Sequence, residues 1–191
     1  MLYKAYHHEI VGNVIAYIAK RYHEHNGYNI YQMPMYKILA LFDFQCVKKL
    51  GSPCLELDFR ARRMGPVPEE LYNNKQFEDS FTEFKTIRSM TQDGQQRKQY
   101  ECTCTPDLDY LSTDEQNILE ESINRLIDCD AKEASETSHK LVKAWSAAFN
   151  RTPISQMLYA EEFDRNIYLV DSSELTLPEY TLIQYNEFAN A

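Results

Sequence analysis

The N-terminal part of the chain carries a helical pattern of apolar residues. Over residues 6–22 the apolar side chains include Ile10, Val14 and Ile18, joined by Val11 and Ile15, which recur at intervals of three and four residues. This spacing places them on one face of a helix. The pattern therefore predicts a core helix at the start of the chain.

A second helical pattern runs from Pro34 to Gly51. Proline suits the first turn of a helix and glycine the position after its end, while Lys48 and Lys49 complement the dipole in the last turn. Its apolar stripe consists of Tyr36, Leu39, Phe42, Cys46 and Val47. Asp43 interrupts this stripe, and either a bond to a neighbouring polar group or exposure to solvent would account for it.

Three short segments follow the pattern of strands. Apolar and charged residues alternate over 55–62, which predicts a half-exposed strand, although Asp58 would equally cap a short helix. Thr86–Met90 and Gln99–Thr103 flank Asp93-Gly94, a dipeptide typical of hairpins. The long polar stretch after that dipeptide indicates a wide loop instead of a two-residue turn.

The segment Met64–Pro68 interrupts this alternation. Gly65 tolerates the positive backbone angles of a tight turn, while Pro66 and Pro68 restrict φ to near −65°. Pro68 also suits the first position of a helix, and the acidic pair at 69–70 favours the positive end of its dipole. We predict a rigid elbow here that leads into a short helix.

Two capping signals mark helices in the second half of the chain. Ser112 and Glu115 have the spacing of a capping box, and Asp130 and Glu133 repeat it more weakly. The first helix is predicted to carry Ile118, Leu119, Ile123, Leu126 and Ile127 on its buried face to about Cys129, and the second to carry Leu141, Val142, Trp145, Ala148 and Phe149. Because the connection is short, the two are expected to pack as an antiparallel hairpin.

Beyond Pro153 the pattern weakens. We expect a short helical piece at Ile154–Tyr159 and short strands at Asn166–Val170 and Thr181–Tyr185, within an acidic segment rich in tyrosine.

Composition narrows the possible functions. A chain of 191 residues suits one domain, with or without an appendage, and a net charge of −9 disfavours a general binder of nucleic acid. Arg60, Arg62 and Arg63 form one local basic group, interpreted as a solvated face beside the elbow. No apolar run is long enough to span a bilayer, and neither a secretory signal nor a cysteine framework is evident among the five cysteines, so a reducing cytoplasm is expected.

No catalytic motif stands out. Five glycines leave little material for a phosphate-binding loop, and the pair Cys102-x-Cys104 lacks the second pair that a zinc site requires. His139 is the natural candidate base for a cysteine nucleophile, but an imidazole bonded to the backbone at a helix interface is the favoured interpretation. The histidines near the N-terminus are interpreted as surface residues, so no metal, no cofactor and no enzymatic activity are expected.

Several segments together resemble one known family, the Panacea domain of SocA-like antitoxins from bacteria and their phages. The similar segments are Tyr36–Asp43, Ala61–Val67 followed by Tyr72, the Leu111-Ser112 and Glu115 helix start, and Ser138-His139 with Trp145 downstream. The similarity covers about residues 8–150. Arg62 replaces the family's usual aromatic residue, and the acidic segment from about Glu161 is additional.

The resemblance implies a compact, mainly helical domain of the α+β class with a small β-hairpin or short antiparallel sheet. It implies residues 1–155 as the Panacea-like antitoxin domain, and 156–191 as an acidic extension packed on it or trailing from it. The implied function is neutralisation of a cognate toxin, encoded nearby, by direct protein–protein binding; the alternative is an adaptor or phage-encoded interaction protein that delivers a partner to a protease or host factor. Membrane attachment and direct nucleic-acid binding are not expected. The family-motif positions, expected to bind the partner or to act as scaffold, are Lys37, Asp43, Gly65, Pro66, Val67, Tyr72, His139 and Trp145.

Overall fold

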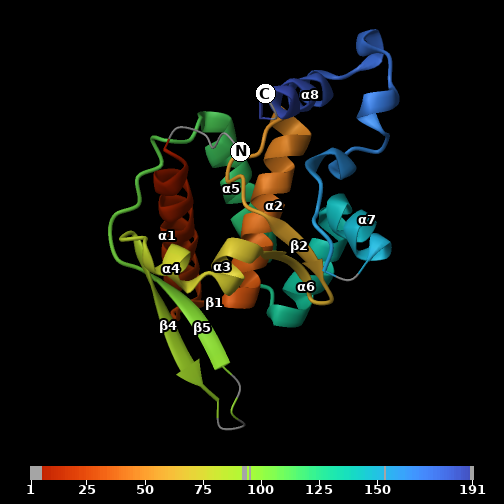
Figure 1. Ribbon diagram of the computed structural model, residues 1–191. Helices are drawn as coiled ribbons and strands as arrows, with labels where there is room; N and C mark the ends of the chain where they lie inside the picture. The colour runs from red at the N-terminus through yellow and green to blue at the C-terminus, as the bar shows by residue number, and fades with distance from the viewer. Residues whose placement is uncertain (1–5, 92–93, 95, 153, 190–191) are drawn as a thin grey trace.

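Helix α2 (Gln32–Leu50) runs through the centre of the molecule, and most other elements pack around it (Figure 1). The computed structural model describes residues 6–91, 94, 96–152 and 154–189. The neighbours of α2 include helices from both halves of the chain and the hairpin that contains Gly65. The fold is α+β and mainly α, as predicted.

The elements follow one another in a simple order. The α-helices are α1 (His7–Asn26), α2, α3 (Glu69–Asn73), α4 (Lys75–Asp79), α5 (Thr113–Leu126), α6 (Ala131–Leu141), α7 (Lys143–Arg151) and α8 (Leu177–Ala189). The strands are β1 (Ile30–Tyr31), β2 (Phe59–Arg62), β3 (Gly65–Pro68), β4 (Phe84–Met90) and β5 (Gln96–Cys102). Short 3₁₀ helices lie at η1 (Tyr159–Glu162), η2 (Ile167–Leu169) and η3 (Ser172–Glu174).

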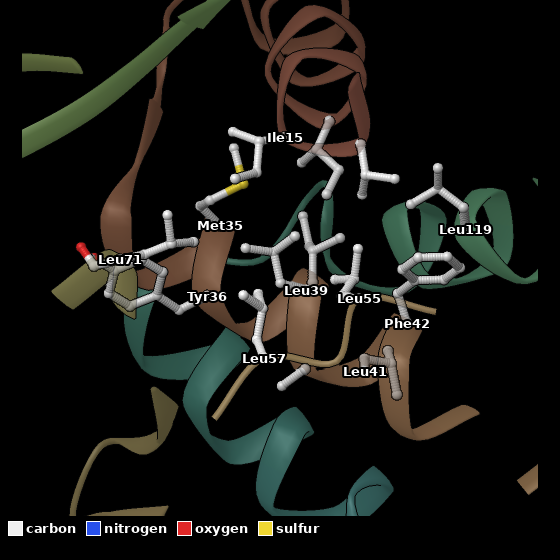
Figure 2. Packing of buried hydrophobic residues seen from close by; sticks show 14 of the residues in the cluster. Ile15, Met35, Tyr36, Leu39, Leu41, Phe42, Leu55, Leu57, Leu71 and Leu119 are labelled. Atoms are coloured by element: carbon white, nitrogen blue, oxygen red, sulfur yellow. The ribbon is translucent and has the colours of Figure 1, made fainter. Parts of the chain in front are cut away.

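The two predicted N-terminal helices are confirmed. Helix α2 ends at Gly51, whose φ of 83° is left-handed and whose N–H donates to the carbonyl oxygen of Val47. Figure 2 shows Met35 of α2 beside Ile15 of α1, and Phe42 beside Leu119 of α5. Because α2 is covered from several sides, it is buried along most of its length. This explains why its apolar residues are not confined to the single stripe predicted from the sequence.

The β4–β5 hairpin is confirmed and forms a three-stranded antiparallel sheet with β1, in the order β1-β5-β4. It extends away from the helices at the lower left of Figure 1. Gly94 lies in the connection with a φ of 77°, while Asp93 lies outside the described residues. The strands end at Met90 and resume at Gln96, so the loop is wider than a two-residue turn, as expected.

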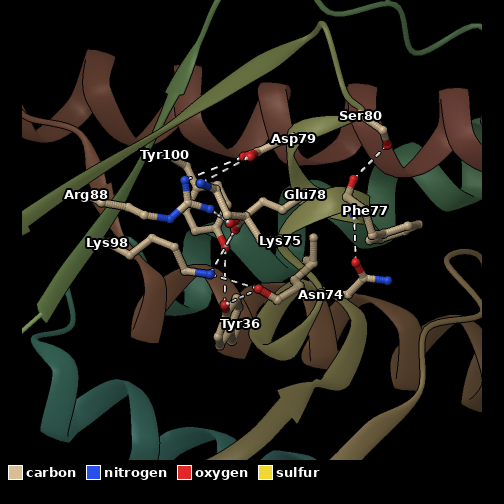
Figure 3. A network of polar contacts seen from close by, with 11 residues as sticks. Tyr36, Asn74, Lys75, Phe77, Glu78, Asp79, Ser80, Arg88, Lys98 and Tyr100 are labelled. Atoms are coloured by element: carbon tan, nitrogen blue, oxygen red, sulfur yellow. Dashed lines mark hydrogen bonds and ion pairs between the residues drawn. The ribbon is translucent and has the colours of Figure 1, made fainter.

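A buried carboxylate ties this sheet to α4 and α2 (Figure 3). Glu78 accepts hydrogen bonds from Tyr100 Oη at 2.7 Å and Lys98 Nζ at 2.9 Å, and it also pairs with Arg88. Tyr36 Oη of α2 donates to the carbonyl oxygen of Leu71 at 3.0 Å. The charge of Glu78 is therefore fully matched, which makes this network structural.

The predicted strand at 55–62 is only half correct. Strand β2 begins at Phe59, whereas Leu55 and Leu57 lie in irregular chain and are buried together with the intervening Glu56. The N–H groups of Cys54 and Leu55 are bonded to the Asp43 side chain, so this stretch satisfies its backbone without a strand partner.

The predicted elbow is the return strand of a hairpin. Strand β3 pairs antiparallel with β2, with Arg62 opposite Gly65, so the chain reverses at Arg63 and Met64. Pro68 precedes helix α3 directly, which confirms a short helix after it. The reversal lies earlier than predicted because Gly65, with a φ of 99°, continues the strand pairing.

Both capping boxes are confirmed. Ser112 Oγ accepts from the N–H of Glu115, and Asp130 Oδ1 accepts from the N–H of Glu133. The single helix predicted after Asp130 is instead two, because Val142 has extended backbone angles and separates α6 from α7. Helices α5 and α6 both pack chiefly on α2, so the predicted α-helical hairpin is replaced by two helices that share one central partner.

The C-terminal predictions are wrong in detail. Gln156 forms a β-bridge with Arg60, where a helical piece was predicted, and the two predicted strands are the 3₁₀ helix η2 and part of α8. Leu182 of α8 is buried in a small cluster with Val47 and Ile167. Short apolar runs do not distinguish strand from helix by period, and here packing on α2 selects the helix.

Candidate functional site

Lys37 is buried in the centre of the motif region. Its side chain on α2 is fully shielded from solvent, and Nζ donates to the carbonyl oxygen of Pro66 at 2.8 Å. Burial lowers the pKa of Lys37 to about 7, because the charged ammonium loses its hydration. The lysine thus joins α2 to strand β3 through a backbone bond.

Gly65 fits directly over this lysine. A Cβ at position 65 would lie 2.9 Å from Lys37 Cε and 2.9 Å from Ser138 Oγ, and the φ of 99° disfavours any L side chain. Ser138 is itself fully buried on α6 and donates to the carbonyl oxygen of Ser135. The glycine is therefore required both by its backbone angle and by close packing.

His139 and Trp145 stack beside this contact. Their ring centroids are 3.6 Å apart and nearly parallel, and Trp145 Nε1 donates to the carbonyl oxygen of Arg62 at 3.1 Å. Burial, followed by the nearby charge of Lys37, lowers the pKa of His139. Among the described residues its buried Nε2 has no hydrogen-bond partner, so ring stacking replaces the expected bond to the backbone.

Arg62 connects the buried residues to the surface. Its guanidinium lies 4.5 Å from the centroid of the Tyr72 ring and pairs with Glu69 at 3.2 Å. Tyr72 remains 45% exposed. Arg60 likewise pairs with Asp58, at 2.7 Å.

Asp43 and Val67 belong to other parts of the core. Asp43 Oδ1 accepts from the N–H groups of Cys54 and Leu55 at 2.8 and 2.6 Å, and Oδ2 accepts from Tyr159 Oη at 2.8 Å. The structure thereby decides the question left open by the sequence: Asp43 is buried and bonded. Val67 is a buried core residue of β3.

The structure brings most of the motif positions into one group. We call it the motif cluster, and it comprises Lys37, Gly65, Pro66, Ser138, His139 and Trp145. Lys37 and Ser138 have no solvent-exposed surface, so a substrate has no access to them in this conformation. The geometry holds the β2–β3 hairpin in place through contacts from α2, α6 and α7.

The other chemical candidates do not assemble a site within the part of the chain that the structure describes. No three His, Cys, Asp or Glu side chains there lie close enough to hold a metal ion. Cys102 Sγ contacts the carbonyl oxygen of Cys104 at 3.0 Å, and burial raises the pKa of the Cys104 thiol. His25 pairs with Asp128 at the surface.

The comparison with known protein families points to the same part of the chain as the motif cluster. The family profile described as antitoxin SocA-like, Panacea domain, matches residues 35–146, which spans every member of the cluster. The chain belongs to the SocA-like Panacea family. No curated protein and no solved structure matches it at a significant level. Over the described part of this Panacea protein, none of the helices is both long and apolar enough to cross a membrane.

The sequence interpretation missed Ser135 beside the cluster and recognised Ser138 only as a motif position. Both lie on α6 at the hairpin, and Ser135 Oγ donates to the carbonyl oxygen of Met64 at 2.8 Å. Their spacing of three residues, on the same face as the buried Ala134, was an available signal. Glu56 was missed because the alternating pattern assigned it to the exposed face of a strand.

Proposed function

We propose that this Panacea protein neutralises a protein toxin by direct binding and without catalysis. One observation carries the proposal: the motif cluster holds the β2–β3 hairpin from inside, while the residues around its turn are exposed. Lys37 bonds the backbone of Pro66, and Ser135 bonds that of Met64. The architecture of the motif cluster thus supports a binding surface instead of an active-site cavity.

The exposed residues around the hairpin have the composition of a protein interface. We call them the hairpin surface, which comprises the exposed Arg63, Met64, Tyr72 and Phe149 and, beside them, the half-buried Arg62 and Trp145. Met64 is 49% exposed, and Phe149, which stacks on Trp145 at 5.0 Å, is 37% exposed. Aromatic residues, methionine and arginine are enriched at interfaces, and they dominate the energetic centre of many complexes.

The charge of the chain suits a basic partner. A net charge of −9 attracts a positively charged protein and repels nucleic acid, which favours fast association with a toxin that itself acts on nucleic acid. The five cysteines, all within the described residues, form no disulfide bond, which fits a reducing compartment such as the cytoplasm.

Growth assays test this function. The gene next to the one for this chain is expressed alone and together with it, and we expect growth arrest in the first case and growth in the second. Tyr72→Ala combined with Met64→Asp should abolish the rescue, because both residues are exposed on the hairpin surface. Met90→Asp, at a residue 68% exposed on the other hairpin, is the control and should leave rescue intact. A neighbouring product that is harmless, or that the unaltered chain fails to neutralise, contradicts the proposal.

A second candidate function is delivery of the partner to a protease. We propose that residues 1–155 form the antitoxin domain and 156–191 an extension, and the extension exposes Leu169, Leu177 and Phe188 by 83%, 78% and 71%. Such apolar side chains fit a second binding surface. Replacing all three by serine should lengthen the half-life of the partner if delivery occurs, and should leave it unchanged if occlusion alone is the mechanism.

A further inference from the structure

An acidic cavity lies between the irregular chain before β2 and the C-terminal segment. Its volume is about 750 Å³. The side chains that define its chemistry are Glu56, Asp58, Glu70, Tyr159, Tyr168 and Tyr185. No lysine, arginine or histidine lines it among the described residues. The cavity therefore combines several carboxylates with aromatic rings and has no built-in cation.

Glu56 is the unusual member of this group. The residue is 6% exposed, and no cation of the described residues pairs with its carboxylate, whose polar neighbour is the Tyr185 hydroxyl. Burial of an unmatched carboxylate is unfavourable, so such a group indicates a missing positive partner. Its backbone is also left-handed, with a φ of 51°, which is rare for glutamate and typical of residues held in place for function.

The surrounding groups hold the walls of the cavity. Asp58 Oδ2 is paired with Arg60, whereas its buried Oδ1 has no partner in the described part of the chain. The Tyr168 hydroxyl accepts from Asn186 of α8 at 2.7 Å, which fixes the ring. Burial, followed by the charge of Glu56 and a hydrogen bond to its carboxylate, raises the pKa of Tyr185, so this phenol is a neutral donor beside the carboxylate and leaves its charge without a cation.

We propose that this cavity binds an arginine side chain of the partner protein, with its guanidinium paired to Glu56. A guanidinium matches a carboxylate through two parallel hydrogen bonds and stacks on tyrosine rings, which an ammonium does less well. The acidic lining and the negative net charge exclude an anionic ligand and favour a basic partner. The identity of the partner as a toxin rests on the proposed function, whereas the cation chemistry of the cavity stands by itself.

Binding of small probes tests the cavity without the partner. N-acetyl-L-argininamide is titrated into the full chain while the tyrosine ring resonances are followed by NMR, with N-acetyl-L-leucinamide as the uncharged control. We expect saturable shifts of Tyr168 and Tyr185 with the arginine compound and none with leucine. Spermidine is the third probe, and tighter binding of spermidine than of the arginine compound would overturn the assignment to a protein side chain.

Glu56→Gln supplies the decisive variant. It removes the unmatched charge and keeps the shape, so we expect a stable fold and affinity for the arginine compound that is about tenfold weaker. Glu187→Gln removes an exposed charge on α8 and should leave affinity unchanged. Tyr168→Ala, at a residue 55% exposed, gives a second variant that does not depend on the core and should weaken binding about fivefold.

The outcomes separate this inference from the proposed function. The proposed arginine site is overturned if binding is not saturable, or if the Glu56→Gln and unaltered chains have equal affinity. Neither result affects neutralisation through the hairpin surface. Arginine binding together with failure to neutralise the neighbouring gene product overturns the antitoxin function and leaves the cavity standing. When both hold, Glu56→Gln should also reduce rescue in the growth assay.

Discussion

Gly65 occupies a position where backbone angle and packing impose the same choice. We expect Gly65→Ala to lower the free energy of unfolding by about 3 kcal/mol, because the new methyl group meets Lys37 and Ser138 and the left-handed φ is disfavoured. Gly27→Ala is the matched control: its φ is 76°, but a Cβ there meets nothing within 4 Å, so a loss of only about 1 kcal/mol is expected. Urea denaturation measures both, and equal losses would show that the packing over Lys37 is unimportant.

The buried ammonium of Lys37 should make stability depend on pH. Its pKa is about 7 in the folded state against 10.5 when unfolded, so between these values the unfolded chain binds more protons. Stability therefore rises with pH across this window, by up to about 1.4 kcal/mol per pH unit, and the penalty of burial is fully present below pH 7. Urea denaturation at pH 7, 8 and 9 should show this rise.

Lys37→Met removes the titrating ammonium group and should make the free energy of unfolding much less dependent on pH over the same range. Lys75→Met is the control, since the Lys75 side chain is 73% exposed and its loss should preserve the slope. Identical slopes in all three chains would contradict a buried titrating lysine at this position.

At the scale of elements, the capping residues set where helices begin. Ser112→Ala removes the acceptor for the N–H of Glu115, so we expect a loss of about 1 kcal/mol in the free energy of unfolding. Ser146→Ala, at an exposed position inside α7, should change stability by less than about 0.5 kcal/mol. Thermal unfolding of the two variants distinguishes them, and a similar effect of both would mean that the cap contributes little.

The elements that sequence predicted well are those whose signals are local. Helix α2 has proline in its first turn and glycine after its end, and α5 has a complete capping box. The segment Thr181–Tyr185 lacked such signals, and its short apolar run fitted strand and helix equally. The break at Val142 was also invisible, because it leaves the apolar residues on both sides available for the core.

At the scale of the whole molecule, the C-terminal segment completes the core around α2. Tyr159 Oη donates to Asp43, and Leu182 covers Val47. A chain that ends at residue 155 should therefore lose at least about 3 kcal/mol of stability, because apolar surface is uncovered and a buried carboxylate loses a partner. Leu169→Ala, at a side chain 83% exposed, controls for changes within the segment that leave the core intact. Unchanged thermal stability of the shortened chain would show that the segment only lies against the domain.

The amino-acid sequence by itself determined the class of fold, the main helices, the β4–β5 hairpin and membership of the family, because these depend on periodicity, caps and motif order along the chain. Only the tertiary structure decided what the motif residues contact. Lys37 and Gly65 meet because α2, β3 and α6 converge on one point, and no spacing along the chain records that contact. The same holds for Glu56, whose burial beside Tyr185 comes from the packing of the C-terminal segment. Local signals specify elements, whereas contacts between distant residues depend on how those elements pack.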